Sequence, residues 1–546
     1  MDHQRALNQL RSREVLSVAL NYALFDRVNG DFLFDPLEIE NARANSETLI
    51  NELIEELRDP GQFEPRPAFA FFPPKNHLCD RRLIYIPIKD LTVRYSMAIV
   101  FSEQIESEIH PQCFAYRRAT GNYVRNRFTE EFSTGGWARF CQWQAERCGD
   151  NSVLLRTDIS AFYDSISHEY LIDAVCRHLM LPRDCALISL FQRLLRVPVI
   201  YYSPSTGQIE GPAMTHQGLP IGDGVEGYLA NLYLKDVDDA MVRAQARYGR
   251  YVDDIRLFGN SRQEIHQHLR ILQVQLLGKG LNLNSSKTEI AEDEPSRSEL
   301  MSRLYYGSGA DNVENEQAGS AIQEQVDLPF EQFARTFTEE QSLEGGSDAK
   351  DFCKFLGAHT ANGQPIVALG NRQIWHIERL HEVVSRWRGP TKHATWLLAQ
   401  TAVYRDVPTQ VQQQARNVVM ELLRDDNISP YSRYRLLHHL IKARQAHGGM
   451  VSRFIDQFNL VERQRIEALL PRYLAASAFE LNLVALYYLT ILGRSVTELR
   501  ELAAAHCRHG CEPVRNALEA AARITQSQPP PATFNDEPDA TPEPTS

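Results

Sequence analysis

Apolar residues repeat at two different spacings along the chain. In residues 1–65, and again from about 352 to 525, they recur every three to four residues, the spacing that places them on one face of a helix. Between 66 and 290 the helical pattern alternates with short runs of apolar, β-branched and aromatic residues, which are typical of strands. The clearest helical stretches of the second half are 374–387, 394–403, 410–423 and 431–443, and the clearest strand-like runs are 83–88, 153–157 and 199–202.

Changes in composition divide the chain further. Residues 291–350 are polar, acidic and rich in Gly and Ser, which favours an irregular linker or insertion. The last residues are rich in Pro, Glu and Asp, a composition typical of disorder. Successive helical patterns with almost no strand signals suggest a solenoid-like domain, although no strict sequence repeat is present. We therefore expect an N-terminal helical segment (1–65), an α+β domain (66–290), a linker (291–350), an α-helical domain (351–525) and a disordered tail (526–546).

The bulk composition is that of a globular protein outside the membrane. The chain has 546 residues with 43% hydrophobic and 23% charged residues, enough for two or three domains. It contains no apolar run long enough to span a bilayer, and residues 1–5 lack the apolar core of a signal sequence. We therefore expect a cytoplasmic protein with no membrane partner.

The charge balance restricts the kind of nucleic-acid contact that can be expected. The net charge of −12 argues mildly against a broad nucleic-acid surface, because dedicated nucleic-acid binders are usually basic. However, 49 of the 58 cationic residues are arginine, which binds phosphate through two parallel hydrogen bonds. Local phosphate-binding patches are therefore compatible with an acidic chain.

The nine cysteines are scattered and odd in number, as expected for free thiols in a reducing compartment. One local cluster has residue types that could bind zinc. No second ligand pair with suitable spacing accompanies it, so packing at a helix end is the favoured interpretation. The cluster consists of His506, Cys507, His509 and Cys511.

Two adjacent carboxylates, Asp253 and Asp254, lie in the middle of a strand-like region. The flanking residues from Arg247 to Gly259 predict a β-hairpin with these acids at its tip. Neighbouring carboxylates raise each other's pKa unless a cation lies between them, so the tip is a candidate Mg²⁺ site. The alternative is a solvated turn, because Asp is common in turns.

Three further stretches carry candidate chemistry. Asp158 ends an apolar strand-like run, where it could supply a third carboxylate or simply cap a helix. Gln217 and Gly218 lie in a Pro- and Gly-containing loop that precedes a predicted helix, an arrangement that suits close approach of a base or a phosphate. Lys287 follows in a loop before a short strand, where it could equally be an ordinary exposed cation.

The order of these elements resembles motifs A, B, C and D of reverse transcriptases. The corresponding sequences are the run ending at Asp158, the loop from His216 to Gly222, the Tyr-Val-Asp-Asp turn, and the stretch from Gly280 to Thr288. Upstream, residues 81–90 and 110–117 look like two motifs of the fingers of these enzymes. The resemblance covers roughly residues 65–290 and implies a right-hand polymerase fold with fingers and palm, followed by the all-α domain.

The resemblance also implies the chemistry of the site. Nucleotidyl transfer uses two divalent ions, Mg²⁺ or its substitute Mn²⁺, that clamp the attacking 3′-oxygen and the leaving phosphate. Their expected ligands are Asp158 and Asp253, with Asp254 beside them. Lys287 is the expected proton donor to pyrophosphate.

The same resemblance assigns the nucleotide pocket. Tyr163 is expected to lie under the sugar as a steric gate that favours dNTPs over rNTPs. Gln217 and Gly218 are expected to line the incoming dNTP, and Arg82, together with Arg81, to reach its phosphates. The departures from the family pattern are Asp223 and Glu226 in motif B, where a small Ser or Thr is usual. We favour helix N-terminal acids here; a contact with a base edge is the alternative.

The acidic balance and the long helical C-terminal region look like the bacterial antiviral defence and abortive-infection reverse transcriptases. Partners implied by this resemblance are dNTPs, an RNA template or noncoding RNA, and a DNA product. Members of that group can also start from a protein primer or work without a template. A homo-oligomer or a partner protein bound through the helical domain is compatible with the pattern. The alternatives are a group II intron- or retron-type enzyme of a mobile element, and a nucleic-acid-binding scaffold whose helical domain is the effector.

Overall fold

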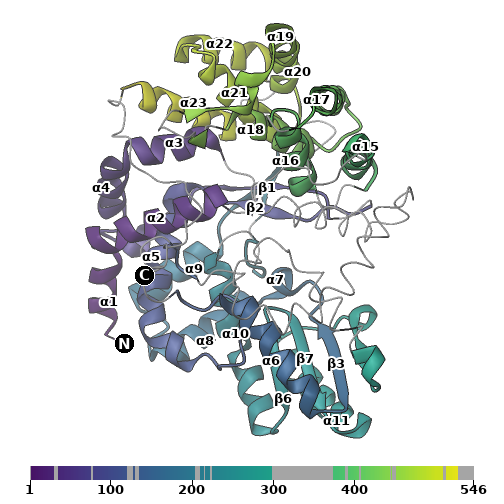
Figure 1. The fold of residues 1–546 in the computed structure, drawn as a ribbon. Helices are drawn as coiled ribbons and strands as arrows, with labels where there is room; N and C mark the ends of the chain where they lie inside the picture. The colour runs from purple at the N-terminus through teal and green to yellow at the C-terminus, as the bar shows by residue number, and fades with distance from the viewer. Residues whose placement is uncertain are drawn as a thin grey trace, which may run out of the picture.

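The computed structural model describes residues 2–29, 35–75, 78–119, 127–129, 135–202, 209–213, 216–221, 224–297, 300, 373–387, 391–404, 407–442, 444–445, 451–507 and 512–526. Most of the expected linker, residues 351–372 of the expected helical domain, and the tail after Gln526 lie outside these ranges. Within these ranges, the chain forms an N-terminal group of helices, a middle part with two sheets, and a C-terminal group of helices. Figure 1 shows the C-terminal group at the top and the middle part extending to the bottom.

Four helices form the N-terminal group, as the helical pattern of residues 1–65 predicts. Their bounds are α1 His3–Leu10, α2 Arg13–Asn29, α3 Pro36–Ala44 and α4 Ser46–Glu56. Asp35 caps α3, because its carboxylate accepts the backbone N–H of Leu37 at 3.0 Å and Pro36 occupies the first helical position. Helix α2 packs along the buried helix α5, Ile88–Ile105.

The first sheet, which we call the fingers sheet, joins segments far apart in sequence. Its strand order is β2-β1-β4-β5, and β1 pairs in parallel with β4. The strands are β1 Ala68–Phe71, β2 Leu83–Tyr85, β4 Val199–Tyr202 and β5 Ile209–Ala213. The strand-like run expected over 83–88 is shorter than predicted: Pro87 has no N–H for a strand ladder and becomes the N-cap of α5.

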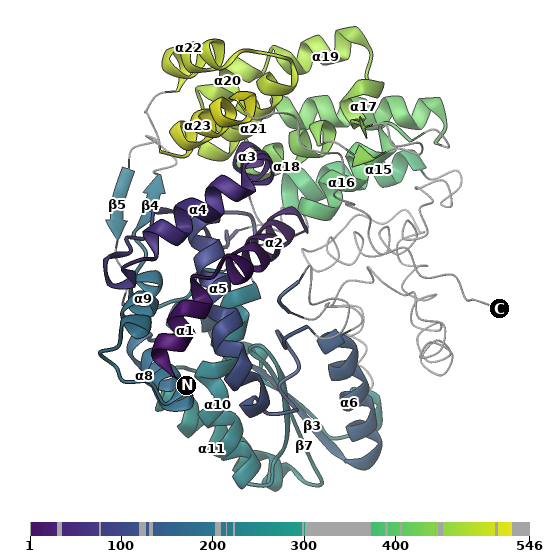
Figure 2. The ribbon, with the colours of Figure 1, turned by 90° about the vertical axis from the view of Figure 1, so that its left-hand side faces the viewer.

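The second sheet, which we call the palm sheet, is antiparallel with the strand order β6-β7-β3-β8. Alternate residues of its strands face opposite sides. Ile255 and Leu257 join the large core, whereas Phe258 packs against Trp143 on the other face. Figure 2 shows α11 and α6 on the two sides of β3 and β7. The bounds are α6 Trp137–Asp150, β3 Val153–Asp158, α10 Gly224–Arg243, β6 Arg247–Tyr251, β7 Asp254–Gly259, α11 Arg262–Leu277 and β8 Glu289–Ala291.

In the described part of the C-terminal group, the chain is helical apart from one two-residue strand pair, β9 Arg444–Gln445 with β10 Val451–Ser452. The four helices expected from the apolar pattern are present within a few residues of their predicted bounds. The helices are α15 Gln373–Glu382 with a π-helical turn at Val383–Trp387, α16 Thr391–Thr401, α17 Thr409–Arg424, α18 Pro430–Ile441, α19 Leu460–Glu467, α20 Leu470–Leu474, α21 Phe479–Ile491, α22 Val496–His506 and α23 Glu512–Gln526.

This helical group docks on the N-terminal helices and the fingers sheet. Helix α23 packs on α3, and the hydroxyl of Tyr487 donates to Glu40 at 2.8 Å. The ring of Phe71 in β1 stacks on Tyr431 at 6.2 Å between centroids. Figure 1 accordingly shows the C-terminal helices at the end of the molecule opposite the palm sheet. None of the described helices combines the length and the apolar character needed to cross a bilayer.

Candidate active site

The predicted hairpin at the centre of the site is confirmed. Strands β6 and β7 are joined by Val252 and Asp253, with Tyr251 paired to Asp254. Val252 has a φ of +59°, a left-handed conformation that is rare for a β-branched residue. Such a conformation costs about 1–3 kcal/mol and persists only where the surrounding structure enforces it. The strained turn leaves Asp253 at the tip and Asp254 as the first residue of β7.

The third carboxylate comes from the neighbouring strand. Asp158, the last residue of β3, lies directly opposite Asp254 in the antiparallel register. Directly opposed residues point to the same face of a sheet. The backbone N–H of Ile159 also donates to the carbonyl of Asp253 at 3.2 Å, which ties the hairpin tip to the end of β3. The structure therefore brings the three predicted carboxylates to one end of the palm sheet.

Lys287 reaches the same end of the sheet. It lies in a short 3₁₀ turn, Ser285–Lys287, just before β8. Its Nζ donates to Asp158 Oδ2 at 2.8 Å, and the amide of Asn284 lies 3.4 Å from the same oxygen. The lysine side chain is 56% exposed, so it can move away from Asp158 at little cost.

The chemistry of the carboxylates fits a divalent cation. The pKa of Asp253 is raised to about 7, first by burial and then by the negative charge of Asp158. A cation between the two would relieve both effects, and carboxylate oxygens are the ligands that Mg²⁺ prefers. Mg²⁺ is usually held by one or two carboxylates together with substrate phosphates. Among the described residues, no group of three His, Cys, Asp or Glu side chains is arranged to hold a metal ion by itself.

A buried polar network holds the hairpin against α10. Arg250 in β6 is fully buried and binds both oxygens of Asp238 at 2.8 Å. Its remaining nitrogen donates to the side chain of Asn231 at 2.8 Å, and Tyr248 also donates to Asp238, at 2.9 Å. Buried charges are stable only when paired in this way. The network therefore fixes α10 relative to the hairpin turn.

The loop carrying Gln217 and Gly218 is fixed to the segment after Asp158. Gly218 has a φ of +93°, which glycine alone adopts without strain, and its N–H donates to the carbonyl of Ile166 at 2.7 Å. The buried His168 lies 2.8 Å from the Gly218 carbonyl through its Nε2. Gln217 pairs with Ser167 in an isolated β-bridge. The two predicted residues thus lie beside the turn that carries Tyr163.

Tyr163 lies near the carboxylates and has an aromatic neighbour that the sequence did not single out. Its pKa is raised well above the usual value, mainly by burial and then by Tyr116 and Asp253. Tyr116, whose φ is +50°, packs directly over Gly227 of α10, where an added Cβ would lie 2.2 Å from the ring. Tyr116 lies in the stretch 110–117, which resembles a fingers motif, and this position was the available sign in the sequence. Its contact with Gly227 of α10 is visible only in the structure.

The two predicted phosphate-binding arginines have different surroundings. Arg82 pairs with Asp164, the residue after Tyr163, and its other nitrogen donates to the hydroxyl of Tyr201 at 2.9 Å. This places the guanidinium between the fingers sheet and the turn after β3. Arg81 is exposed, and its backbone N–H donates to the carbonyl of Pro73 at 2.8 Å. Of the two, the structure brings only Arg82 next to the other site residues.

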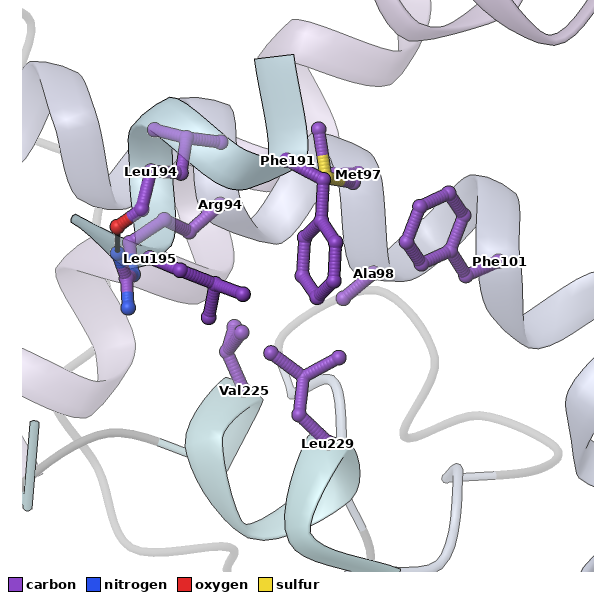
Figure 3. A pocket seen from close by; sticks show the side chains of 9 residues that line it. All are labelled: Arg94, Met97, Ala98, Phe101, Phe191, Leu194, Leu195, Val225 and Leu229. Atoms are coloured by element: carbon purple, nitrogen blue, oxygen red, sulfur yellow. Dashed lines mark hydrogen bonds between the residues drawn. The ribbon is translucent and has the colours of Figure 1, made fainter. Parts of the chain in front are cut away.

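Glu226 lies in the first turn of α10, as expected for a helix N-terminal acid, but its surroundings differ from the expectation. It is 1% exposed and accepts from Nε of the buried Arg94 at 2.8 Å. Arg94 also borders a mainly apolar cavity of about 10 Å³, shown in Figure 3, which has room for about one water molecule. The acid therefore has a structural partner inside the core. Asp223 lies outside the described residues.

The possible zinc cluster is only partly described. His506 ends α22 and Cys507 follows it, whereas His509 and Cys511 lie outside the described residues. The alternative of packing at a helix end agrees with the position of His506, and the cluster's metal binding stays untested.

Comparison with known proteins supports the resemblance. Residues 98–359 match the family model described as reverse transcriptase (RNA-dependent DNA polymerase). The chain therefore contains a reverse transcriptase domain, and this domain includes the carboxylates, the Gln217 loop and Lys287. The match extends beyond residue 290, where the resemblance to the family's motifs ended.

Two further comparisons concern curated protein sequences and solved structures. No curated protein sequence matches the chain. Among solved structures, the chain is similar to an apo telomerase from Candida tropicalis truncated from the C-terminal domain, at 11% identity and a TM-score of 0.31. That alignment covers 46% of this chain and 55% of the telomerase chain.

Proposed function

We propose that this protein is an RNA-directed DNA polymerase that works by two-metal nucleotidyl transfer. The observation that carries the proposal is the convergence of Asp158, Asp253 and Asp254 at one end of the palm sheet, within a domain that matches the reverse transcriptase family. In this reaction the primer 3′-oxygen attacks the α-phosphorus of a dNTP, a new P–O bond forms, and pyrophosphate leaves. Bound Mg²⁺ ions would activate the attacking oxygen and neutralise the leaving group.

We assign the other roles as follows. Asp158 and Asp253 would hold the cations with their carboxylates. Lys287, whose Nζ lies 2.8 Å from Asp158 Oδ2, would give a proton to the departing pyrophosphate. Little covalent chemistry is left for the protein, so the rate depends on positioning and charge neutralisation.

The nucleotide pocket is assigned to the elements around the turn after β3. Tyr163 gates the sugar, and Gln217 and Gly218 line the base and sugar. Arg82 reaches the triphosphate from the fingers sheet, after exchanging its contact with Asp164 for a phosphate. Arg81, the exposed residue before Arg82, is assigned a supporting contact with the phosphates.

The direct test is dNTP incorporation by the purified full-length chain on primed RNA with Mg²⁺ or Mn²⁺. The double variant D253N/D254N should incorporate no dNTP, while its circular dichroism spectrum stays that of the parent. Incorporation that survives in the double variant would reject the proposal. Sequencing the nucleic acid that co-purifies with the protein, and the product that it makes, then separates templated, untemplated and noncoding-RNA-dependent synthesis.

We further propose that the polymerase acts in bacterial antiphage defence. The support is the acidic chain and the helical C-terminal group, which docks on the fingers sheet and N-terminal helices. Phage challenge of cells that express the parent or D253N/D254N tests this role. Equal plaque formation on cells with the parent and on cells without the protein would reject the defence role and leave the polymerase proposal standing.

A further inference from the structure

The three carboxylates at the end of the palm sheet differ in what holds them. Asp254 is held by an arginine two residues further along its own strand. Residues i and i+2 of a strand lie on one face, so the side chains of Asp254 and Arg256 can meet. The two terminal nitrogens of Arg256 bind the two carboxylate oxygens at 2.7 and 2.9 Å, as a bidentate fork.

Arg256 has no freedom to leave this position. It is 0% exposed, and its Nε donates to the amide oxygen of Gln144 on α6 at 2.9 Å. Gln144 is itself fully buried and donates to the carbonyl of Phe140 at 3.1 Å. The guanidinium also lies 5.6 Å from the centre of the Phe140 ring. Helix α6 therefore fixes the arginine, and the arginine fixes Asp254.

A second arginine reinforces the positive charge beside Asp254. Arg156 in β3 is the direct cross-strand partner of Arg256, and its Nε lies 3.7 Å from Asp254 Oδ1. The negative charge of Asp254 is thus compensated by the chain itself, through groups that are buried or half-buried. A cation from solvent would have to compete with both.

Asp158 and Asp253 lack such a lock. The partner of Asp158 is Lys287, a single exposed ammonium on a flexible side chain. Among the described residues, no ion pair to Asp253 is present, and its side chain is half-buried. These two carboxylates can turn toward a bound ion without breaking a buried bidentate contact.

We propose that Arg256 is a positioning residue that holds Asp254 in a fixed, charge-compensated position, so that divalent ions at the hairpin are held by Asp158 and Asp253. Asp254 then shapes the site from its arginine-bound position, and Arg256 limits the total negative charge around the metal. This inference rests on the proposed polymerase site and adds to it a positioning role for Arg256.

The test measures Mn²⁺ binding to the full-length protein by electron paramagnetic resonance, without nucleotide. Removing a carboxylate that holds the ion should abolish the high-affinity signal, so D158N and D253N should lose it. Removing a residue that contacts a metal site without binding the ion typically weakens metal affinity by about 10- to 100-fold. We therefore expect D254N to retain measurable binding, weakened by about tenfold, at the lower end of this range. Loss of binding in D254N equal to that in D253N would overturn the inference.

The variant R256M gives a readout that structural damage alone does not produce. It releases Asp254 and leaves its charge uncompensated, so Mn²⁺ should bind several-fold more tightly than in the parent. The double variant D254N/R256M removes the released charge together with the arginine and should lose that gain. If R256M does not fold, Q144M loosens the arginine without changing any charge and should tighten binding in the same direction. Weaker binding in the folded R256M or Q144M variant would count against the inference.

The outcome is independent of catalysis. Mn²⁺ binding that depends on Asp158 and Asp253 but comes with no dNTP incorporation would reject the polymerase proposal and support the metal assignment. If the parent incorporates dNTPs but Mn²⁺ binding depends equally on all three carboxylates, the polymerase proposal is supported and the metal assignment is rejected.

Discussion

At the scale of single residues, the site combines rigid and mobile charges. Arg250 and Arg256 are buried and bound at several atoms, whereas Lys287 and Arg82 are more exposed and make contacts that a phosphate can replace. Rigid charges set the position of the hairpin, and mobile charges can follow the substrate. This division suits a reaction in which positive charge must move with the departing pyrophosphate.

The position of Tyr163 predicts sugar selectivity. Replacing Tyr163 with Ala should remove the ring below the sugar and raise rNTP incorporation relative to dNTP incorporation by about tenfold or more, since a steric clash of a few kcal/mol is relieved. Steady-state incorporation of matched dNTP and rNTP pairs measures the ratio. Tyr163→Phe, which keeps the ring, is the matched control and should retain the parent ratio. An unchanged ratio in the Ala variant would exclude the gate.

The buried pair of Glu226 and Arg94 predicts a stability effect. Glu226→Gln should lower the free energy of unfolding by about 3–5 kcal/mol, because it leaves the guanidinium without its buried counter-charge. Urea denaturation measures the change. The double variant E226M/R94M removes both charges and should recover much of the loss. A loss of well under 1 kcal/mol in E226Q would mean that Arg94 finds another partner.

At the scale of elements, two acids lie at the start of α3: the buried N-cap Asp35 and the half-buried Glu38 in the first turn. Burial, reinforced by the nearby Asp35, raises the pKa of Glu38 to about 8, and burial raises that of Asp35 to about 7. The Glu38 carboxylate accepts from the hydroxyl of Tyr85 and, at 2.9 Å, from the N–H of Ile88. These contacts join α3 to β2 and to the first turn of α5.

The raised pKa of Glu38 predicts a pH-dependent stability. In the unfolded chain the carboxyl loses its proton near pH 4.5, whereas in the folded chain it keeps the proton up to about pH 8. The folded state therefore binds more protons in this window, so stability falls as the pH rises through it. Thermal unfolding at pH 6 and pH 8.5 should show a larger decrease for the parent than for Glu38→Gln. Equal decreases would show that Glu38 does not carry the dependence.

Elements that depend on local interactions could be predicted from the sequence, whereas contacts that depend on the fold could not. The hairpin at Tyr251 to Asp254 and strand β3 follow from local alternation and turn residues, and the structure confirms them. The short β2 reflects a local conflict, because Pro87 favours a helix start over a longer strand. The partners of Glu226 and Asp254 were missed for different reasons. Arg94 is 132 residues away from Glu226, and Arg256 is held against Asp254 by Gln144 of α6, 112 residues before it in the chain.

At the scale of the whole molecule, the C-terminal helices are joined to the N-terminal ones through polar and aromatic contacts. Tyr487 binds Glu40, α23 packs on α3, and Tyr431 stacks on Phe71 of the fingers sheet. The carboxylates lie in the palm sheet, beyond the fingers.

Weakening the contact between Tyr487 and Glu40 should loosen this junction selectively. Tyr487→Phe should lower the free energy of unfolding by about 1–3 kcal/mol, because it leaves the Glu40 carboxylate without a buried donor. Hydrogen exchange should increase in α3 and α21 and stay unchanged in the palm strands. Tyr170→Phe, on an exposed tyrosine of the helix His168–Leu179, is the control and should change neither. An increase spread evenly over the palm would contradict a local junction.

The parallel pairing of β1 with β4 has a consequence for the making of the protein. Residue 68 pairs with residue 199, so the fingers sheet cannot form on the ribosome until the strands after α9, Ala186–Leu195, have been synthesised. The face of α3 that receives α23 stays uncovered for longer still. Contacts between distant segments form slowly and leave apolar surfaces open in the meantime. We therefore expect a nascent chain that depends on protection by chaperones until residues 479–526 have been added.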